Sequence, residues 1–272
     1  MTARVGRWLG TCLILAIVLV PIYWMLSTSL KSNKEITQDA TLYPRDPSFD
    51  NYRNLFAEKE FGSYFLNSIV VTGVSVLVSL VLGSLGAYAI ARFRLVLRLE
   101  RRIGLALLTM RIAPAVVILI PVYLLILKLD LLDTWLGLII IYTALNVTFV
   151  VWMMESFFRE IPVDLEEAAM VDGDSRLSAF RRIVVPLAAP GLVATAIFAV
   201  IVTFNEFLFA LVLTATPAAM TMPRGTATLI GRIDTDWASM SAAGVLGALP
   251  IVIFALIVQR HLVRGLTLGA VK

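Results

Sequence analysis

The chain has few of the residues that build catalytic and metal centres. Its 272 residues include one cysteine and one histidine, so neither an internal disulfide nor a Cys/His metal cluster can form. Any Ser/His/Asp set would have to be centred on His261, and no H-E-x-x-H pattern occurs. We therefore expect no enzyme active site, metal or cofactor on this chain.

Charge is scarce as well. Charged residues make up 15% of the chain and hydrophobic residues 59%, whereas a soluble domain carries about 25% charged residues. No Gly-Lys dipeptide is present, which excludes a phosphate-cradling Walker loop. If ATP drives this protein, another chain must bind the ATP and its Mg²⁺. The basic residues are not interleaved with aromatics on a soluble face, so nucleic-acid binding is not expected.

What the chain has instead is long apolar runs. A helix crosses a bilayer with about 20 apolar residues. The runs lack the alternation of barrel strands, and a helix satisfies its own backbone in lipid. We therefore predict an all-α integral membrane protein that forms one transmembrane domain over residues 1–272. The six predicted helices are about 9–30, 66–91, 103–127, 135–158, 187–213 and 239–263.

The basic residues predict the orientation of these helices. If the N-terminus lies inside, 14 of the 23 Lys and Arg residues fall on inner segments and eight on outer segments. The short stretch 92–102, with five arginines, is the strongest single indication. Because cytoplasmic loops carry the excess of Lys and Arg, both termini are expected in the cytoplasm.

Small side chains recur at four-residue spacing in the second run. Ser79, Gly83, Ala87 and Ala91 share one helix face, which lets a neighbouring backbone approach closely. We interpret this row as a packing face; the alternative is that it lets helices slide during gating.

One polar insert, about residues 159–186, separates the fourth and fifth runs. Its pattern predicts two short helices. Gly173 fits a left-handed cap at the end of the first, Asp174 or Ser175 fits the N-cap of the second, and Pro186 is expected to stop the second. Ala168 and Ala169 offer a smooth surface suited to a groove in another protein. From these residues alone, a cytosolic hairpin without a partner is an equal alternative.

Polar residues inside the predicted helices form a second candidate site. Ionisable side chains in a membrane are costly and usually face a cavity or a partner. Arg111 and Glu206, with the amides of Asn146 and Asn205, are therefore candidates for the path of a hydroxyl-rich or charged solute. The alternative is an interhelical hydrogen bond or ion pair, such as Arg111 with Glu206. Glu155 is expected to be an interfacial residue.

The polar insert resembles the EAA loop of permease subunits in ATP-binding-cassette importers. That signature is Glu-Ala-Ala, a Gly after three intervening residues, and Ile-x-Leu-Pro after nine more, with Val185 here in place of Leu. Phe204-Asn205-Glu206-Phe207 and the tail 259–272 are similar to segments of the MalG-type carbohydrate branch, and the overall likeness is to SugB-type subunits of trehalose importers. The matching positions are Glu167, Ala168, Ala169, Gly173, Ile183 and Pro186.

The resemblance implies a type I importer permease fold in the bacterial cytoplasmic membrane. It also implies three partners: a second, different permease chain, two ATPase subunits that carry ATP and Mg²⁺, and an extracytoplasmic sugar-binding protein or lipoprotein. The helix with Glu167, Asp172 and Gly173 would dock on an ATPase. Segment 214–238 would contact the binding protein, and 264–272 would reach toward the ATPases.

The solute implied by the resemblance is a sugar, such as the disaccharide trehalose or an oligosaccharide. Glycerol phosphate or another polar solute is the alternative within the same importer class, and Arg111 would suit an anionic group. An ion-coupled secondary transporter is a further alternative. It would need an ion-coupling site and no ATPase.

Overall fold

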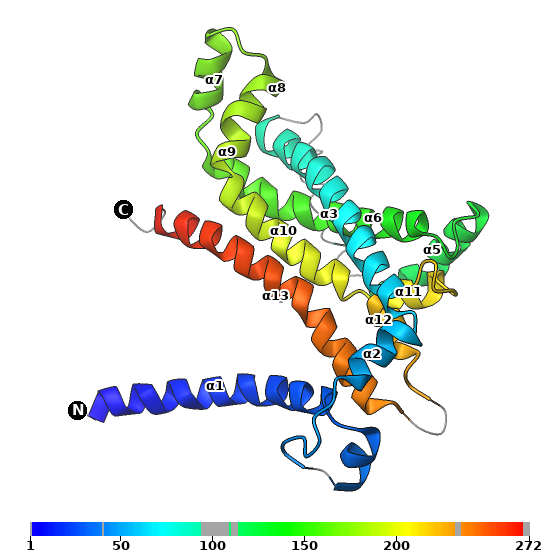
Figure 1. Ribbon diagram of the computed structural model, residues 1–272. Helices are drawn as coiled ribbons and strands as arrows, with labels where there is room; N and C mark the ends of the chain where they lie inside the picture. The colour runs from blue at the N-terminus through cyan, green and yellow to red at the C-terminus, as the bar shows by residue number, and fades with distance from the viewer. Residues whose placement is uncertain (1, 40, 94–108, 110–113, 232–234, 269–272) are drawn as a thin grey trace. The chain divides into compact units, whose positions relative to one another are not determined.

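The computed structural model describes residues 2–39, 41–93, 109, 114–231 and 235–268, with side chains described between residues 7 and 257 (Figure 1). Within these ranges the chain is helical, and its only strand-like feature is an isolated bridge between Ile230 and Thr235. The α-helices are α1 Thr2–Ser29, α2 Asp50–Ala57, α3 Phe61–Arg92, α5 Ala115–Lys128, α6 Trp135–Glu160, α7 Asp164–Val171, α8 Arg176–Ala179, α9 Val185–Leu187, α10 Ala189–Phe204, α11 Leu208–Leu213, α12 Met222–Ala227 and α13 Trp237–Leu268. Two π-helical turns complete them, η1 Glu35–Asp39 and η3 Phe180–Val184.

The predicted membrane architecture is confirmed in its class. Among the described residues, four helices are long and apolar enough to cross a membrane, namely α1, α3, α6 and α13. A bent pair, Arg176–Leu187 with Ala189–Phe204, adds a fifth if it counts as one span. The helices predicted at 9–30, 66–91, 135–158 and 239–263 are all present. Of the one predicted at 103–127, most of the N-terminal half lies outside the described residues, and α5 covers the remainder.

The prediction of one continuous helix over 187–213 is wrong. The axis bends by 75° at Ala188, and the helix that follows ends at Phe204. The side chain of Asn205 donates to the carbonyl of Ile201 at 2.8 Å, and the carboxylate of Glu206 accepts the backbone N–H groups that open α11. Both side chains compete with the continuous backbone ladder, so the chain leaves the helix and starts a new one.

Contacts divide the chain into two compact units. One comprises residues 1–65 and 222–250, and the other residues 66–221 and 251–272. In the second unit the small-residue face of α3 packs on α6, as predicted. A Cβ added at Gly83 would lie 2.6 Å from the side chain of Val150, so this crossing admits no larger residue without a shift.

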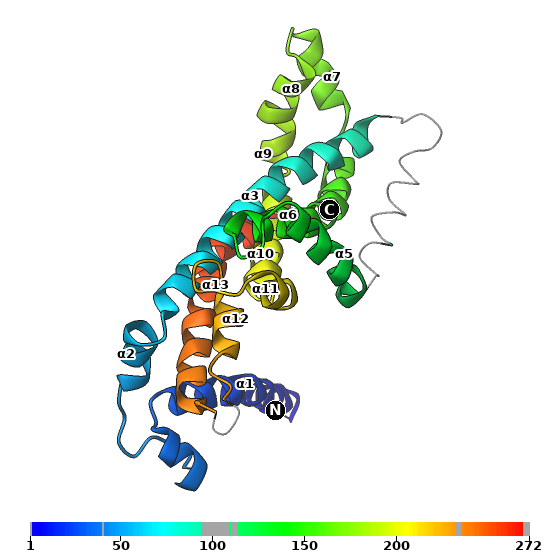
Figure 2. The same ribbon diagram turned by 90° about the vertical axis from the view of Figure 1, so that its right-hand side faces the viewer.

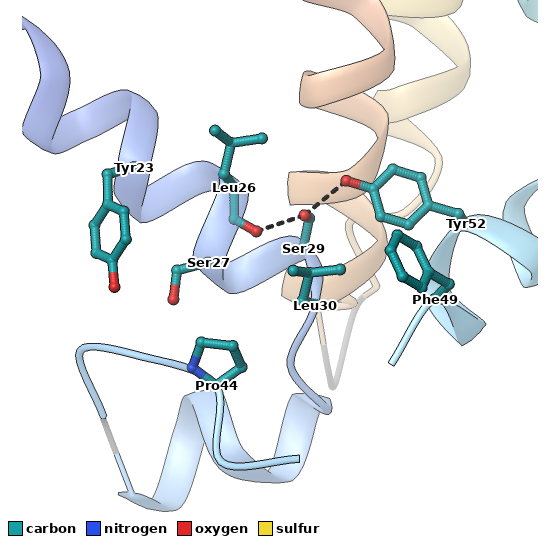
Figure 3. Close-up of a pocket in the computed structure, with 8 residues that line it drawn as sticks. All are labelled: Tyr23, Leu26, Ser27, Ser29, Leu30, Pro44, Phe49 and Tyr52. Atoms are coloured by element: carbon teal, nitrogen blue, oxygen red, sulfur yellow. Dashed lines mark hydrogen bonds between the residues drawn. The ribbon is translucent and has the colours of Figure 1, made fainter. Parts of the chain in front are cut away.

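The first unit contains a cavity of about 300 Å³ at the end of α1 (Figure 3). Its lining is mostly apolar, and the hydroxyl groups in it already form hydrogen bonds within the chain. Ser29 and Tyr52 share a hydrogen bond of 2.7 Å, and Ser27 and Tyr23 both donate to the carbonyl of Leu42. The described lining therefore offers a ligand little polar recognition. The residues that line it are Tyr23, Leu26, Ser27, Ser29, Leu30, Pro44, Phe49 and Tyr52.

Candidate functional site

The polar insert folds as the predicted helical hairpin, which Figure 2 shows as α7 and α8 side by side. Gly173 ends the first arm with φ +96°. Its N–H donates to the carbonyl of Met170 at 3.2 Å, and the N–H of Asp174 donates to that of Ala169 at 3.0 Å. These two bonds form a Schellman motif, which satisfies the last carbonyls of the helix and suits glycine best. The predicted cap is confirmed.

The second arm starts where expected and ends differently. The hydroxyl of Ser175 accepts the N–H of Ser178 at 3.2 Å, which makes Ser175 the N-cap. The prediction that Pro186 stops this arm is wrong. Pro186 lies in the first turn of α9, where a missing N–H costs little, and the direction changes two residues later at Ala188.

The signature residues divide by exposure. Glu167 and Ala168 are exposed on the first arm, and Asp172 and Gly173 are exposed in the turn. Ala169 and Ile183 are half-buried, and Pro186 is exposed. Apolar side chains near the exposed set are also open to solvent: Leu165, Val171 and Leu177. Val171 is 87% exposed, so apolar surface is open to solvent beside the exposed signature residues.

Glu166 is the residue of this site whose contacts the sequence analysis missed. Its side chain is buried, and Oε1 lies 2.5 Å from Nε of Arg92, with both side chains only 5% exposed. The hydroxyl of Tyr88 donates to Oε2 at 2.5 Å. Nη2 of Arg92 also donates to the carbonyl of Ile161, the residue that ends α6, at 2.9 Å. One buried cation thus joins the ends of α3 and α6 to the hairpin.

Aromatic rings extend this junction to the second arm. The ring centroid of Tyr88 lies 4.6 Å from that of Phe180 and 6.1 Å from that of Phe158. The guanidinium of Arg176 lies 5.1 Å from the ring centroid of Phe93, a cation–π distance. The end of α3 therefore contacts both arms of the hairpin. Tyr88 and Arg92, four residues apart, share a helix face, and that spacing was the available signal.

The polar residues predicted within the membrane lie where α6 faces α10 and α11. The buried amide of Asn146 donates to the hydroxyl of Thr203 at 2.7 Å. The hydroxyl of Tyr142 donates to Glu206 Oε2 at 2.6 Å, so this carboxylate makes an interhelical hydrogen bond in addition to capping α11. Asn205 is exposed at the break. Arg111 lies outside the described residues, and with it the predicted pairing of Arg111 with Glu206.

Glu155 forms an exposed ion pair with Arg159 at 2.8 Å, one helical turn along α6. This surface pairing agrees with the interfacial role expected for Glu155. Among the described residues, no group of three or more His, Cys, Asp and Glu side chains could hold a metal ion.

A second polar cluster holds the loop 214–221 that follows α11. The amide of Asn67, near the start of α3, donates to the carbonyls of Pro217 and Met220 at 2.9 and 2.8 Å. Nε1 of Trp135, the first residue of α6, donates to Asn67 Oδ1 and to the carbonyl of Ala218, both at 3.0 Å. The side chains of Asn67 on α3 and Trp135 on α6 thus form hydrogen bonds with the backbone of this loop.

Asp133 caps the same loop. One carboxylate oxygen accepts the backbone N–H groups of Ala215 and Thr216 at 2.8 and 3.0 Å, and the other accepts the Thr216 hydroxyl at 2.5 Å. Burial alone would raise the pKa of Asp133, but these three hydrogen bonds outweigh it and hold the pKa below its ordinary value of 3.8. Asp133 is therefore a charged acceptor at neutral pH.

Comparison with known proteins identifies the architecture. Residues 79–268 match the family described as the binding-protein-dependent transport system inner membrane component. The chain belongs to this family. It is a multi-pass inner-membrane transport component, as the fold class and localisation predicted, and the matched region includes the whole hairpin, α6 and the break after α10.

Relatives of this inner-membrane component cover nearly its whole length. It is 40% identical over 262 residues to the trehalose transport system permease protein SugB of Mycobacterium tuberculosis, covering 96% of this chain and 94% of the relative. It is 34% identical over 272 residues to the trehalose/maltose transport system permease protein MalG of Thermococcus litoralis, covering 99% and 97%. A solved bacterial ABC transporter that imports alginate has the same fold, with a TM-score of 0.79 at 24% identity, covering 95% of this chain and 97% of that one.

Proposed function

We propose that this inner-membrane component is the permease subunit of an ATP-driven sugar importer. Of two relatives that cover nearly the whole chain, one is named as a trehalose permease and the other as a trehalose/maltose permease, and this supports a di- or oligosaccharide such as trehalose as the solute. A second, different permease chain completes the pathway. An extracytoplasmic sugar-binding protein delivers the solute. ATP and Mg²⁺ bind to two separate ATPase subunits.

The hairpin is the docking element for an ATPase subunit. The observation that supports this role is that α7 has one buried face and one face exposed to solvent. The buried Glu166 ties one face to α3, while Glu167, Ala168 and Val171 are open to solvent. A helix held firmly on one side, with small and apolar side chains open beside a carboxylate, suits insertion into a groove of another protein. Gly173 keeps the turn tight enough for the arm to protrude.

Two substitutions test this assignment in the assembled transporter reconstituted in proteoliposomes. Glu167→Lys and Gly173→Asp should reduce ATP-driven trehalose uptake at least about tenfold and uncouple ATP hydrolysis from uptake, while the permease stays inserted. Glu58→Lys, an exposed charge reversal outside the hairpin, is the matched control and should retain coupling to the ATPase. Normal uptake in both hairpin variants would contradict docking through this element.

The solute is tested with the wild-type complex. Labelled trehalose should accumulate only with ATP and the sugar-binding protein, and excess unlabelled glycerol phosphate should not compete. Competition by the phosphate ester would assign the importer to the anionic alternative. Uptake that persists without ATP and collapses with an uncoupler would instead indicate an ion-coupled secondary transporter.

The described polar residues support a position for the solute path at the break after α10. Glu206 and Asn146 form hydrogen bonds with Tyr142 and Thr203 on facing helices, so they hold α6 against the break. Asn205 is exposed there, and its amide nitrogen donates to the carbonyl of Ile201. Its amide oxygen has no donor among the described residues. Asn205 is the side chain of this group best placed to contact a sugar hydroxyl.

A further inference from the structure

The helices α3 and α6 are joined at both ends and in the middle, and all of these contacts lie within the second compact unit. At one end, Trp135 at the start of α6 bonds to Asn67 of α3. In the middle, Gly83 lies directly against Val150. At the other end, Arg92 bonds to the carbonyl of Ile161. The contacts advance in step along both helices, so the pair forms one continuous two-helix body.

Each end of this body also holds a separate polar segment. The hairpin anchor, defined as Tyr88, Arg92 and Glu166, holds α7. The loop anchor, defined as Asn67 and Trp135, holds the backbone of loop 214–221 through three hydrogen bonds. The hairpin anchor uses buried groups, and a buried charge that lost its partner would be left without water to replace it. In the loop anchor Asn67 is buried, whereas Trp135 is 38% exposed.

The part of α3 between the anchors is suited to transmit displacement. From Asn67 to Arg92 the helix advances by 25 residue steps, about 37 Å at a helical rise of 1.5 Å per residue. This stretch contains no proline, and its Gly83-Ser84 pair, another kind of site where helices kink, lies against Val150 of α6. A helix of this kind, packed along its length on a partner, moves as a body and does not absorb displacement locally.

We propose that the α3–α6 pair is a strut that transmits displacement between loop 214–221 and the hairpin. Glu166 and Asn67 are the positioning residues that attach its two ends. The strut rests on the proposed function, because the hairpin end is useful only if an ATPase docks there. By thermodynamic linkage, a binding event at the loop then changes the affinity or turnover at the hairpin, and the reverse.

The test uses the complete transporter in nanodiscs, with both permease chains, the ATPases and the sugar-binding protein. The quantity measured is the ratio of ATP hydrolysis with trehalose-loaded binding protein to hydrolysis without it. Asn67→Ala and Glu166→Gln should each lower this ratio about fivefold or more, in the range of ordinary coupling between sites. Tyr88→Phe, which removes one hydroxyl and no charge, should lower it in the same direction.

The double variant Asn67→Ala/Glu166→Gln gives the decisive result. A strut detached at one end transmits nothing, so the double variant should fall no lower than the more severe single variant. If the fold-reductions of the two single variants multiply in the double variant, Asn67 and Glu166 have independent local roles, and the strut is overturned. Glu155→Gln, which breaks the exposed ion pair on α6, is the matched control and should keep the wild-type ratio.

Two further outcomes separate this inference from the proposed function. A wild-type complex that shows no stimulation by the binding protein would overturn the proposed function and the strut together. A stimulated wild type with equally stimulated Asn67→Ala and Tyr88→Phe variants would overturn the strut alone. Co-purification of the ATPase with each variant confirms that a lowered ratio does not arise from lost assembly.

Discussion

Glu166 and Glu167 are consecutive residues of α7 whose carboxylates occupy opposite environments. Glu166 is 4% exposed and bonds to Arg92 and Tyr88, whereas Glu167 is open to solvent. Successive side chains on a helix point about 100° apart, so one short helix presents both faces. The buried carboxylate attaches the hairpin to the transmembrane helices and leaves the exposed one for another chain.

Removing the buried carboxylate should destabilise the hairpin strongly. Glu166→Ala leaves the guanidinium of Arg92 buried without a counter-charge, which costs about 3–5 kcal/mol. Hydrogen exchange of the α7 amides in nanodiscs should therefore accelerate. The double variant Arg92→Met/Glu166→Met should recover much of the protection, because no charge is left buried. Equal loss of protection in Glu155→Ala, whose ion pair is exposed, would show that the effect is not specific to the buried pair.

Gly173 should tolerate substitution only by residues that accept a positive φ. A Cβ at this position meets no atom within 4 Å, so any cost comes from the backbone conformation and not from crowding. Gly173→Val should cost about 1–2 kcal/mol of hairpin stability, and Gly173→Asn clearly less. Protection of the amides of Gly173 and Asp174 from exchange measures this difference. Indistinguishable valine and asparagine variants would argue against the left-handed cap.

Substitution by alanine should change the stability of the protein in opposite directions at two glycines of α3. Gly83→Ala places a methyl group 2.6 Å from the Val150 side chain, and overpacking of this kind costs about 1–3 kcal/mol. Gly73→Ala meets nothing within 4 Å and should gain up to about 1 kcal/mol from helix propensity. Thermal unfolding in detergent compares the two. A Gly83→Ala variant as stable as Gly73→Ala would contradict the close α3–α6 crossing.

Asp133 should make the stability of the loop 214–221 sensitive to acid. The folded pKa lies below the ordinary value of 3.8, so the stabilisation is fully present above that value and is lost as the pH falls through the folded pKa. Asp133→Asn should be less stable than wild type at pH 7, and the difference should shrink below about pH 4. Thermal unfolding of both proteins between pH 7 and pH 3 checks this. A difference that stays constant over that range would exclude the ionised carboxylate as its cause.

Asn205 and Glu206 should give different defects in uptake. Asn205→Ala removes an exposed amide and should raise the KM for trehalose with little change in assembly. Glu206→Ala removes the cap of α11 and the acceptor of Tyr142, so it should lower the thermal stability of the permease as well. Uptake kinetics and thermal unfolding of the same preparations separate the two. An unchanged KM in Asn205→Ala would remove this residue from the solute path.

The sequence predicted the features that depend on local patterns. Apolar runs located the long helices, and the turn chemistry of Gly173 and Ser175 located the hairpin and both of its caps. The four-residue spacing of small side chains likewise predicted the packed face of α3. Each of these signals is confined to a few neighbouring residues, and each is set by backbone sterics or by the period of the helix.

The features that escaped prediction depend on which elements meet in space. Arg92 served only as a topology marker, because nothing in its surroundings says that its partner is 74 residues away. Similarly, hydrophobicity alone predicted one helix over 187–213. It does not show that the carboxylate of Glu206 accepts two backbone N–H groups of α11 and the hydroxyl of Tyr142 on α6. A polar side chain in an apolar run carries a free-energy cost of burial, but the partner that offsets this cost depends on which helices pack together.

The single cysteine of the chain lies on α1, where Cys12 is exposed and no part of the apolar window of the helix is buried within the chain. This chain therefore carries one thiol, on a side chain that is exposed among the described residues, and no other cysteine to remove. A spectroscopic label at Cys12 would therefore report on the surroundings of α1 without an engineered cysteine.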